Sequence, residues 1–290
     1  MRLNPRELIR QRFGELTPAL QLGARFLLDH PNEVVVASMR SIAERAGVPP
    51  ATLVRLAQAL GFDGWPGLKQ AFVADMGLAS KAYGQRAKSL QQRRSDQALT
   101  GEMFAAQRAN LDATEAHSAA ALQRAAKLLE QARHVHIAGF RASFPIAHTL
   151  AYVYRLFRHS VQLVDAAAGG LEMQMRAFAR GDAVVVISFA PYSREALLVL
   201  QAARAAGCKV VAFTDSEASP LALESDACVL FGVDSPSFFP SIAAGVAAAE
   251  ALLEILVAQA GAAGVAQIER AEQHLFELGT YLQPPPKRGQ

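Results

Sequence analysis

Five short apolar runs, each separated from the next by a longer segment, constrain the fold of the second half of this chain. The runs are HVHIAG (134–139), SVQLV (160–164), DAVVVISF (182–189), KVVAFTD (209–215) and ACVLF (227–231). Segments such as FPIAHTLAYVYRLF and REALLVLQAARAAG lie between them, with apolar residues at helical spacing. Continuous apolar strands that alternate with helices are typical of a parallel sheet covered on both faces. We therefore predict an α/β domain with a five-stranded parallel, flavodoxin-like sheet.

The loops after the first and third of these strands are the predicted ligand site. In a flavodoxin-like strand order, ligands bind beyond the carboxyl ends of those two strands. The loops read GFRASF (139–144) and SFAPYS (188–193). Arg141 carries a charge suited to phosphate or carboxylate, and Ser143 stands at a helix start, where unpaired amides attract anions. The predicted ligand-binding residues are Gly139, Arg141, Ser143, Ser188, Tyr192 and Ser193.

The first 78 residues show no alternating strand pattern and read as short helices. Within them, SIAERAGVPPATLVRLAQALGF (41–62) predicts two helices joined by a tight turn. Ser41 and Glu44 have capping-box spacing, which predicts a helix start at Ser41. Gly47 suits the left-handed end of that helix, and Pro50 suits the first position of the next. This pattern is typical of a helix-turn-helix, whose second helix enters the major groove of DNA.

The second helix of this unit has two expected faces. Its inward stripe is Leu53, Leu56, Ala57 and Leu60. That pattern leaves Thr52, Arg55 and Gln58 exposed, with Pro50 and Ala51 at the helix tip. The predicted DNA-contacting residues are Ser41, Pro50, Ala51, Thr52, Arg55 and Gln58. An ordinary helical hairpin with a solvated face is the alternative.

The distribution of charge supports a nucleic-acid partner for the first part of the chain. Residues 1–110 carry 15 Lys and Arg against 9 Asp and Glu, whereas residues 111–290 carry 14 against 17. A basic front and a mildly acidic back favour a polyanion-binding module joined to another domain. We expect a helix-turn-helix domain at 1–78 and a ligand-sensing and dimerisation domain at 111–282. A basic linker at 79–110 and a flexible tail at 283–290 complete the expected organisation.

Residues 16–75 resemble the N-terminal domain of RpiR-type bacterial transcriptional regulators. The shared features are a Leu-Thr start, the Ala-Gly-Val turn, an Ala-Thr-x-x-Arg recognition helix and the closing Leu60, Gly61, Phe62, Gly64 and Trp65. The resemblance implies an all-α DNA-binding domain whose partner is an operator in double-stranded DNA. One departure is Pro49, which stands where the family usually has a serine cap and offers no side-chain oxygen.

Residues 125–260 resemble the sugar isomerase (SIS) domain, the usual partner of that DNA-binding domain. FTDSEASPLA (213–222) matches the family well, and Gly139 and Ser143 match its Gly-x-Gly-x-Ser loop, with Arg141 in place of the second glycine. In the second loop, Ala190 and Pro191 replace a serine and a glycine, which removes two phosphate donors. The resemblance implies a homodimer or homotetramer that binds a phosphorylated sugar. Another small anionic metabolite, or a vestigial site, remains open.

A DNA-binding domain fused to this site favours a regulator over an enzyme. Isomerisation of a sugar needs an acid and a base, and His148, Glu172 and Glu195 are candidates that nothing in the sequence pairs with one another. We expect no catalytic residues, no metal site and no cofactor, because the histidines and cysteines show no ligand spacing. A sugar-phosphate isomerase or other SIS enzyme is the alternative function, and a non-specific DNA-associated protein is a third.

The remaining segments predict a soluble, cytoplasmic protein. Cys208 and Cys228 have no framework spacing and read as buried reduced thiols. The longest apolar stretch contains Glu250 and Glu254, which suits a packed helix better than a membrane span. Residues 111–131 and 241–260 have more apolar residues than a lone edge helix needs, so we expect them to form dimer surfaces.

Overall fold

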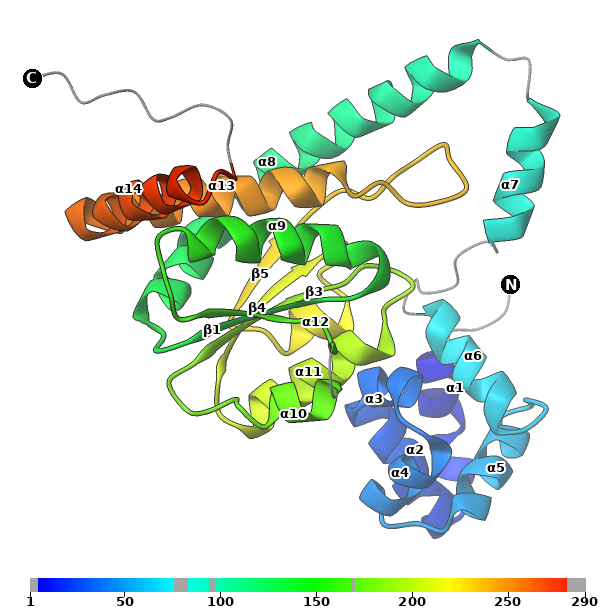
Figure 1. Ribbon diagram of the computed structural model, residues 1–290. Helices are drawn as coiled ribbons and strands as arrows, with labels where there is room; N and C mark the ends of the chain where they lie inside the picture. Colours follow the sequence, from blue (N-terminus) through cyan, green and yellow to red (C-terminus); the bar gives the residue numbers. More distant parts are fainter. Residues whose placement is uncertain (1–4, 76–82, 94–96, 168–169, 281–290) are drawn as a thin grey trace, which may run out of the picture. The chain divides into compact units, whose positions relative to one another are not determined.

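The computed structural model describes residues 5–75, 83–93, 97–167 and 170–280, and the chain divides into two compact units, 1–81 and 82–290. In its described residues the first unit is entirely helical (Figure 1). Its elements are α1 (Pro5–Arg12), a 3₁₀ turn (Phe13–Glu15), α2 (Pro18–Asp29), α3 (Pro31–Val36), α4 (Met39–Arg45), α5 (Pro50–Ala59) and α6 (Trp65–Asp75). The predicted all-α fold of this region is confirmed.

Both helices of the predicted helix-turn-helix end on a glycine with left-handed backbone. Gly47 has φ of +67° and Gly61 has φ of +87°. The amide of Val48 donates to the Ala43 carbonyl at 2.9 Å, so the orphan carbonyls at the end of α4 are satisfied. Glycine adopts this conformation without the steric cost that a side chain brings. The predicted turn at Gly47 is confirmed.

The second unit has a five-stranded parallel sheet. Its strands are β1 (Val135–Gly139), β2 (Val161–Val164), β3 (Ala183–Ile187), β4 (Lys209–Thr214) and β5 (Ala227–Leu230). The order is β2-β1-β3-β4-β5, and every neighbouring pair is parallel. This is the predicted flavodoxin-like order, with the reversal between β1 and β3.

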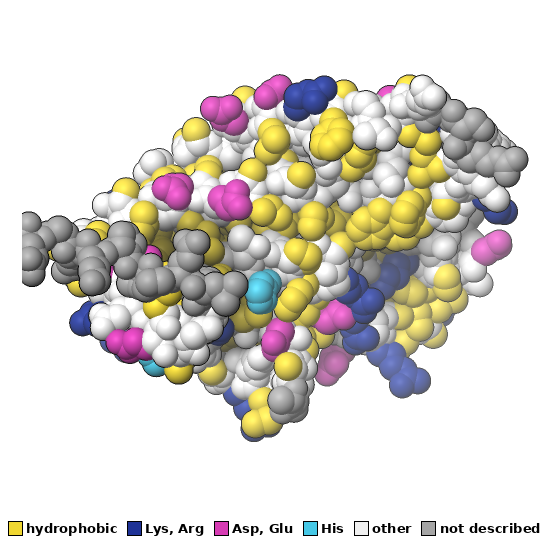
Figure 2. Space-filling view, turned by 45° about the horizontal axis from the view of Figure 1, so that its top comes forward, with side chains coloured by type: hydrophobic (Ala, Val, Ile, Leu, Met, Phe, Trp, Pro, Cys, Tyr) yellow, Lys and Arg dark blue, Asp and Glu magenta, His cyan; other side chains and the backbone are white. Residues whose placement is uncertain are grey.

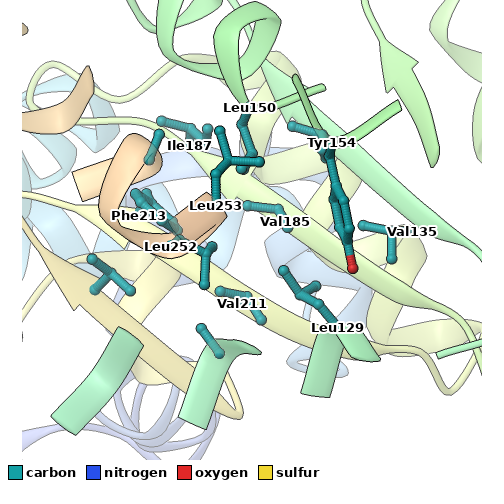
Figure 3. Close-up of a cluster of buried hydrophobic side chains, with 14 of the residues drawn as sticks. Leu129, Val135, Leu150, Tyr154, Val185, Ile187, Val211, Phe213, Leu252 and Leu253 are labelled. Carbon is teal, nitrogen blue, oxygen red and sulfur yellow. The ribbon is translucent and has the colours of Figure 1, made fainter. Parts of the chain in front are cut away.

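Helices cover both faces of the sheet (Figure 1). The helices of this unit are α7 (Tyr83–Gln92), α8 (Ala98–Gln131), α9 (Phe144–Arg155), α10 (Leu171–Met175), α11 (Arg194–Ala205), α12 (Pro220–Leu223), α13 (Ala243–Gln259) and α14 (Gly261–Glu277), and a 3₁₀ turn lies at Arg141–Ser143. On one face, α8, α9 and α13 enclose the main core (Figure 3). Alternate strand residues such as Val185, Ile187 and Phe213 point into that core, as a period of two requires.

Helix α8 is longer than the sequence predicted. It begins at Ala98 and runs without interruption to Gln131, so the boundary expected at residue 110 falls inside a helix. The basic segment is largely helical because it contains no proline and few residues that favour turns. Residues 79–82 and 94–96 of the expected linker, and the expected tail at 283–290, lie outside the described residues.

The apolar residues of α8 and α13 are largely used inside the unit. The two helices pack on each other and bury residues that include Leu122, Leu129, Leu252 and Leu253. This internal packing accounts for the apolar excess that suggested dimer surfaces. Other hydrophobic side chains remain visible over one face of the molecule (Figure 2). Tyr152 and Val265 are among the large hydrophobic residues that are exposed. No single helix among the described residues is long and apolar enough to cross a membrane; α13 and α14 would qualify by composition only as a pair bent by 115°.

Candidate DNA-binding face and ligand site

Helix α5 presents one exposed face and buries the other. Leu53, Leu56 and Ala57 lie in the core of the first unit, while Arg55 and Gln58 are exposed. Pro50 and Ala51 are exposed at the start of the helix, as predicted. Pro49 occupies the N-cap position and makes no side-chain hydrogen bond to the helix. The exposed tip and the Arg55–Gln58 row therefore form a candidate surface for the major groove.

Two of the predicted DNA-contacting residues lie elsewhere than expected. Thr52 is only 1% exposed, because it stands one turn before Leu56 and shares the buried stripe of α5. Ser41 does not cap α4. The cap is Ser38, whose hydroxyl oxygen accepts a hydrogen bond from the Ser41 amide at 3.2 Å. Ser41 is therefore a half-buried residue of the first helical turn, and the capping-box prediction was displaced by three residues.

The helix-turn-helix is held by basic residues that the sequence did not single out. Arg45 pairs with Glu33 and lies over the ring of Phe26 at 5.7 Å. Arg12 donates to the carbonyl of Ala59 at the end of α5, at 3.1 Å. Their charges are thus committed to internal contacts, unlike Arg55, for which no hydrogen bond or ion pair is found among the described residues. Contacts between residues that lie far apart in the sequence leave no periodic pattern, so the sequence alone does not indicate them.

The two predicted ligand loops leave the sheet side by side. Gly139 of β1 is the register partner of Ile187 of β3, so residues 140–143 and 188–193 follow from the same edge. Gly139 is required because α9 approaches the backbone closely at this position. A Cβ there would lie 2.8 Å from the Cβ of Ala147 and 2.8 Å from the Ser143 carbonyl oxygen. The missing side chain lets α9 start directly over the end of β1.

Arg141 and Ser143 shape the first loop. Arg141 has φ of +54°, the left-handed region that the family glycine at this position would favour. Its guanidinium Nη2 donates at 2.8 Å to Glu195 Oε1, in the first turn of α11 after the facing loop. Ser143 is 4% exposed at the N-cap of α9 and makes no side-chain hydrogen bond to that helix. The loop thus brings a cation and a buried hydroxyl to one helix start.

The serines of the second loop organise the loop itself. Ser188 Oγ accepts from the Ser193 amide, and Ser193 Oγ accepts from the Ala196 amide, each at 3.2 Å. The peptide bond between Ala190 and Pro191 is cis. Because a hydroxyl that accepts a hydrogen bond keeps its own hydrogen, both serines can still donate to an anion.

Asp215, which was not among the predicted ligand-binding residues, holds the second loop through two hydrogen bonds. Its carboxylate accepts from the Tyr192 hydroxyl at 2.8 Å and from the Ala190 amide at 3.3 Å. Burial, and then the neighbouring Asp215 charge, raise the pKa of Tyr192. The Tyr192 hydroxyl thus donates to Asp215 and ties the second loop to the end of β4. In the sequence, the Thr-Asp pair at the end of β4 was the feature that could have indicated Asp215 as a site residue.

Glu195 carries the other charge of the site. Its pKa is lowered by a hydrogen bond from its own backbone amide and, against the effect of burial, by Arg141 and Arg194. Its second oxygen, Oε2, is buried and has no hydrogen-bond partner among the described residues. The site therefore contains an ionised carboxylate that is only half satisfied.

The candidate acid–base residues are not brought together. His148 is exposed on α9, with its ring 5.8 Å from Phe144 and 6.1 Å from Tyr152. Glu172 pairs with Arg176 within one exposed helical turn. Of the three candidates only Glu195 contacts a predicted ligand loop, and its hydrogen-bond partner there is the cation Arg141 rather than a second acid or base.

A second polar cluster lies at the opposite, amino end of the sheet. Asp182, buried before β3, lies 3.2 Å from His134 Nδ1 and 3.3 Å from His136 Nε2. Burial lowers the pKa of His136 although the Asp182 carboxylate opposes this. His136 Nδ1 is buried and has no partner among the described residues.

In the described part of the chain, no group of three or more His, Cys, Asp or Glu could hold a metal ion. Both cysteines are free, Cys208 buried and Cys228 half-buried.

Three polar residues on α8 join this helix to the chain that continues β5. Asn110 donates to the Asp234 carbonyl at 2.8 Å, the Gly232 amide donates to Thr114 Oγ1 at 2.9 Å, and Ser118 donates to the Leu230 carbonyl. A Cβ at Gly232 would lie 2.8 Å from the Asn110 Cα, so only glycine permits this approach. We call these three contacts the α8 ladder. Asn110, Thr114 and Ser118 are spaced four residues apart and form a polar stripe on one face of α8. This stripe was the signal in the sequence that could have indicated the contacts.

Comparisons with known proteins agree with this architecture. Residues 3–77 match the helix-turn-helix domain of the rpiR family, and residues 128–255 match the SIS domain. The transcriptional regulator HexR of Pseudomonas aeruginosa is 31% identical over 226 residues, 77% of each chain. HexR of Escherichia coli is 25% identical over 83% of this chain and 82% of that protein.

Solved structures show the same fold at lower identity. The sugar isomerase domain of an RpiR transcription factor from Sphaerobacter thermophilus aligns with a TM-score of 0.58 and 20% identity, over 61% of this chain and 99% of that one. The Vibrio vulnificus NanR protein aligns with a TM-score of 0.52 and 17% identity, over 95% of this chain and 99% of that one. With its N-terminal helix-turn-helix and its SIS domain, this chain belongs to the RpiR family of transcriptional regulators.

Proposed function

We propose that this chain binds an operator in double-stranded DNA through α5 and responds to a small anionic metabolite at the loops after β1 and β3. A phosphorylated sugar is the first candidate for that metabolite, since the similar Vibrio vulnificus protein is described in complex with ManNAc-6P. The regulator acts in the cytoplasm as a homodimer or homotetramer. Ligand binding changes its affinity for DNA, which makes the two sites thermodynamically linked.

The exposed row of Arg55 and Gln58 on an otherwise buried helix carries the DNA-binding half of the proposal. Operator fragments are first selected from genomic DNA with the purified full-length protein. Arg55→Ala is then expected to weaken binding by about 1–3 kcal/mol if Arg55 reads a base, and to relax specificity at one position. Arg270→Ala on α14 removes the same charge from the second unit and is the control. Binding no tighter than to random DNA contradicts the proposal.

The pairing of Arg141 with Glu195 at the start of α11 supports the ligand-binding half. Thermal unfolding is measured with a panel of sugar phosphates and inorganic phosphate. A ligand at a hundred times its dissociation constant stabilises the folded state by about 2.7 kcal/mol. Arg141→Ala is expected to abolish the shift. Arg176→Ala is the matched control, because Arg176 is equally exposed (76% against 74%) and also pairs with a glutamate.

We propose binding without turnover, because the His148, Glu172 and Glu195 side chains have separate surroundings. Each sugar phosphate of the panel is incubated with the protein and followed by phosphorus NMR. Conversion that disappears in His148→Ala or Glu172→Ala would favour the isomerase alternative.

A further inference from the structure

The start of α11 is already occupied by a negative charge from the protein itself. Glu195 stands in the first turn of this helix, where the helix dipole favours an anion, while the Ser193 hydroxyl caps the Ala196 amide. The Glu195 carboxylate accepts a hydrogen bond at 2.8 Å from Arg141, which follows β1. A guanidinium is also the donor that an anionic ligand of this site would use.

We propose that Glu195 is an internal competitor, which holds Arg141 in the absence of ligand and is displaced by the anionic group of the ligand. This inference rests on the proposed function, because it concerns the same pair of loops. It adds a specificity rule. A ligand must carry an anion strong enough to replace a carboxylate, so a dianionic phosphate is favoured over a singly charged acid.

The Arg141–Glu195 contact has the properties of a bond that can be exchanged. The Arg141 side chain is 74% exposed, and ion pairs in contact with water contribute little to stability. Glu195 Oε2 is buried and unpaired among the described residues, and a buried acceptor without a donor is costly. The Arg141–Glu195 contact is thus weakly held at the exposed arginine, and it leaves one carboxylate oxygen of Glu195 without a hydrogen-bond donor among the described residues.

The other charged groups around the site do not provide an alternative internal anion. Asp215 already accepts from the Tyr192 hydroxyl and the Ala190 amide. Arg194, beside Glu195 on α11, adds positive charge that contributes to the lowered pKa of Glu195. Displacing Glu195 therefore frees the Arg141 guanidinium for the incoming anion, near the positive charge of Arg194.

The decisive experiment compares Glu195→Gln with Glu172→Gln. Both changes remove the charge of a glutamate paired with an exposed arginine, but Glu172 lies on α10 within its own helical turn. Affinity for inorganic phosphate and for glucose 6-phosphate is measured by calorimetry on the full-length protein. If the competitor occupies the site for about nine-tenths of the time, its removal tightens binding about tenfold. Glu172→Gln should leave the affinity unchanged within about twofold.

Each other outcome has a separate meaning. Unchanged affinity in Glu195→Gln overturns the proposal, while phosphate binding by the wild type leaves the proposed function in place. Weaker binding of glucose 6-phosphate alone also overturns it and makes Glu195 a direct acceptor of a sugar hydroxyl. Measurable binding by Glu195→Gln with none by the wild type supports the proposal. If neither folded protein binds any phosphate of the panel, both the competitor and the phosphosugar site are rejected; an unchanged melting temperature shows that the variant is folded.

Discussion

The two ends of the parallel sheet carry polar clusters of opposite character. At the amino end, Asp182 and His136 are almost completely buried and lie within contact of each other. At the carboxyl end, Arg141 and Glu195 meet in contact with water, between two loops. Both clusters contain an unpaired buried atom, so an unsatisfied group does not by itself identify a binding site. What distinguishes the carboxyl end is that its charges can be reached and exchanged.

The largest expected effect is on stability, at the amino end. Asp182→Asn removes the charge that faces two histidines and the Ala179 amide, and should cost about 3 kcal/mol of unfolding free energy. Urea unfolding measures the loss. Affinity for phosphate ligands should stay within about twofold of wild type. A loss of ligand binding at unchanged stability would instead indicate that the ligand site lies at the amino end of the sheet.

The second effect is a dependence of stability on pH. The pKa of His136 is lowered in the folded protein, so below about pH 6.5 the unfolded chain binds more protons than the folded one. The free energy of unfolding should therefore fall as the pH drops below about 6.5, by at most about 1.4 kcal/mol per pH unit from this group. His136→Asn should flatten that slope below about pH 6.5. His134→Asn, at an exposed neighbour, is the control, and an equal flattening in both would contradict the assignment.

The third effect lies at the carboxyl end. Tyr192→Phe removes the hydroxyl that donates to Asp215 and should cost about 1 kcal/mol, because Asp215 keeps the Ala190 amide and partial access to water. Because this bond fixes the second loop, ligand affinity should weaken several-fold along with it. Thermal unfolding with and without phosphate separates the two effects. A stability loss with unchanged affinity would show that the loop holds its shape without the tyrosine hydroxyl.

The smallest effect isolates the backbone of Arg141. Both Arg141→Ala and Arg141→Gly remove the ion pair, but glycine adopts the observed φ of +54° more easily. The glycine variant should be more stable than the alanine variant by about 1 kcal/mol. Equal melting temperatures would mean that the first loop relaxes once the side chain is lost.

The fold was largely predictable, and the site only in part. The continuous apolar strands fixed the parallel sheet, and the order placed the two loops together as expected. The errors concerned single residues of short helices: the cap of α4 lies three residues before Ser41, and Thr52 joins the buried stripe because it stands one turn before Leu56. Asp215 and the Arg141–Glu195 pair were missed because contacts between distant loops leave no periodic trace in a sequence.

The α8 ladder sets a limit on how this domain can transmit a change. Four residues of helix advance about 6.0 Å and two residues of extended chain about 6.6 Å, so the three contacts remain nearly in step. One turn beyond either end of the ladder stand Ala106 and Leu122, whose side chains have no polar group to offer. A shift by one turn would therefore leave a backbone group unpaired. Only one alignment of α8 pairs all three residues, so we expect a displacement of the chain after β5 to carry the bonded part of α8 with it instead of sliding along it.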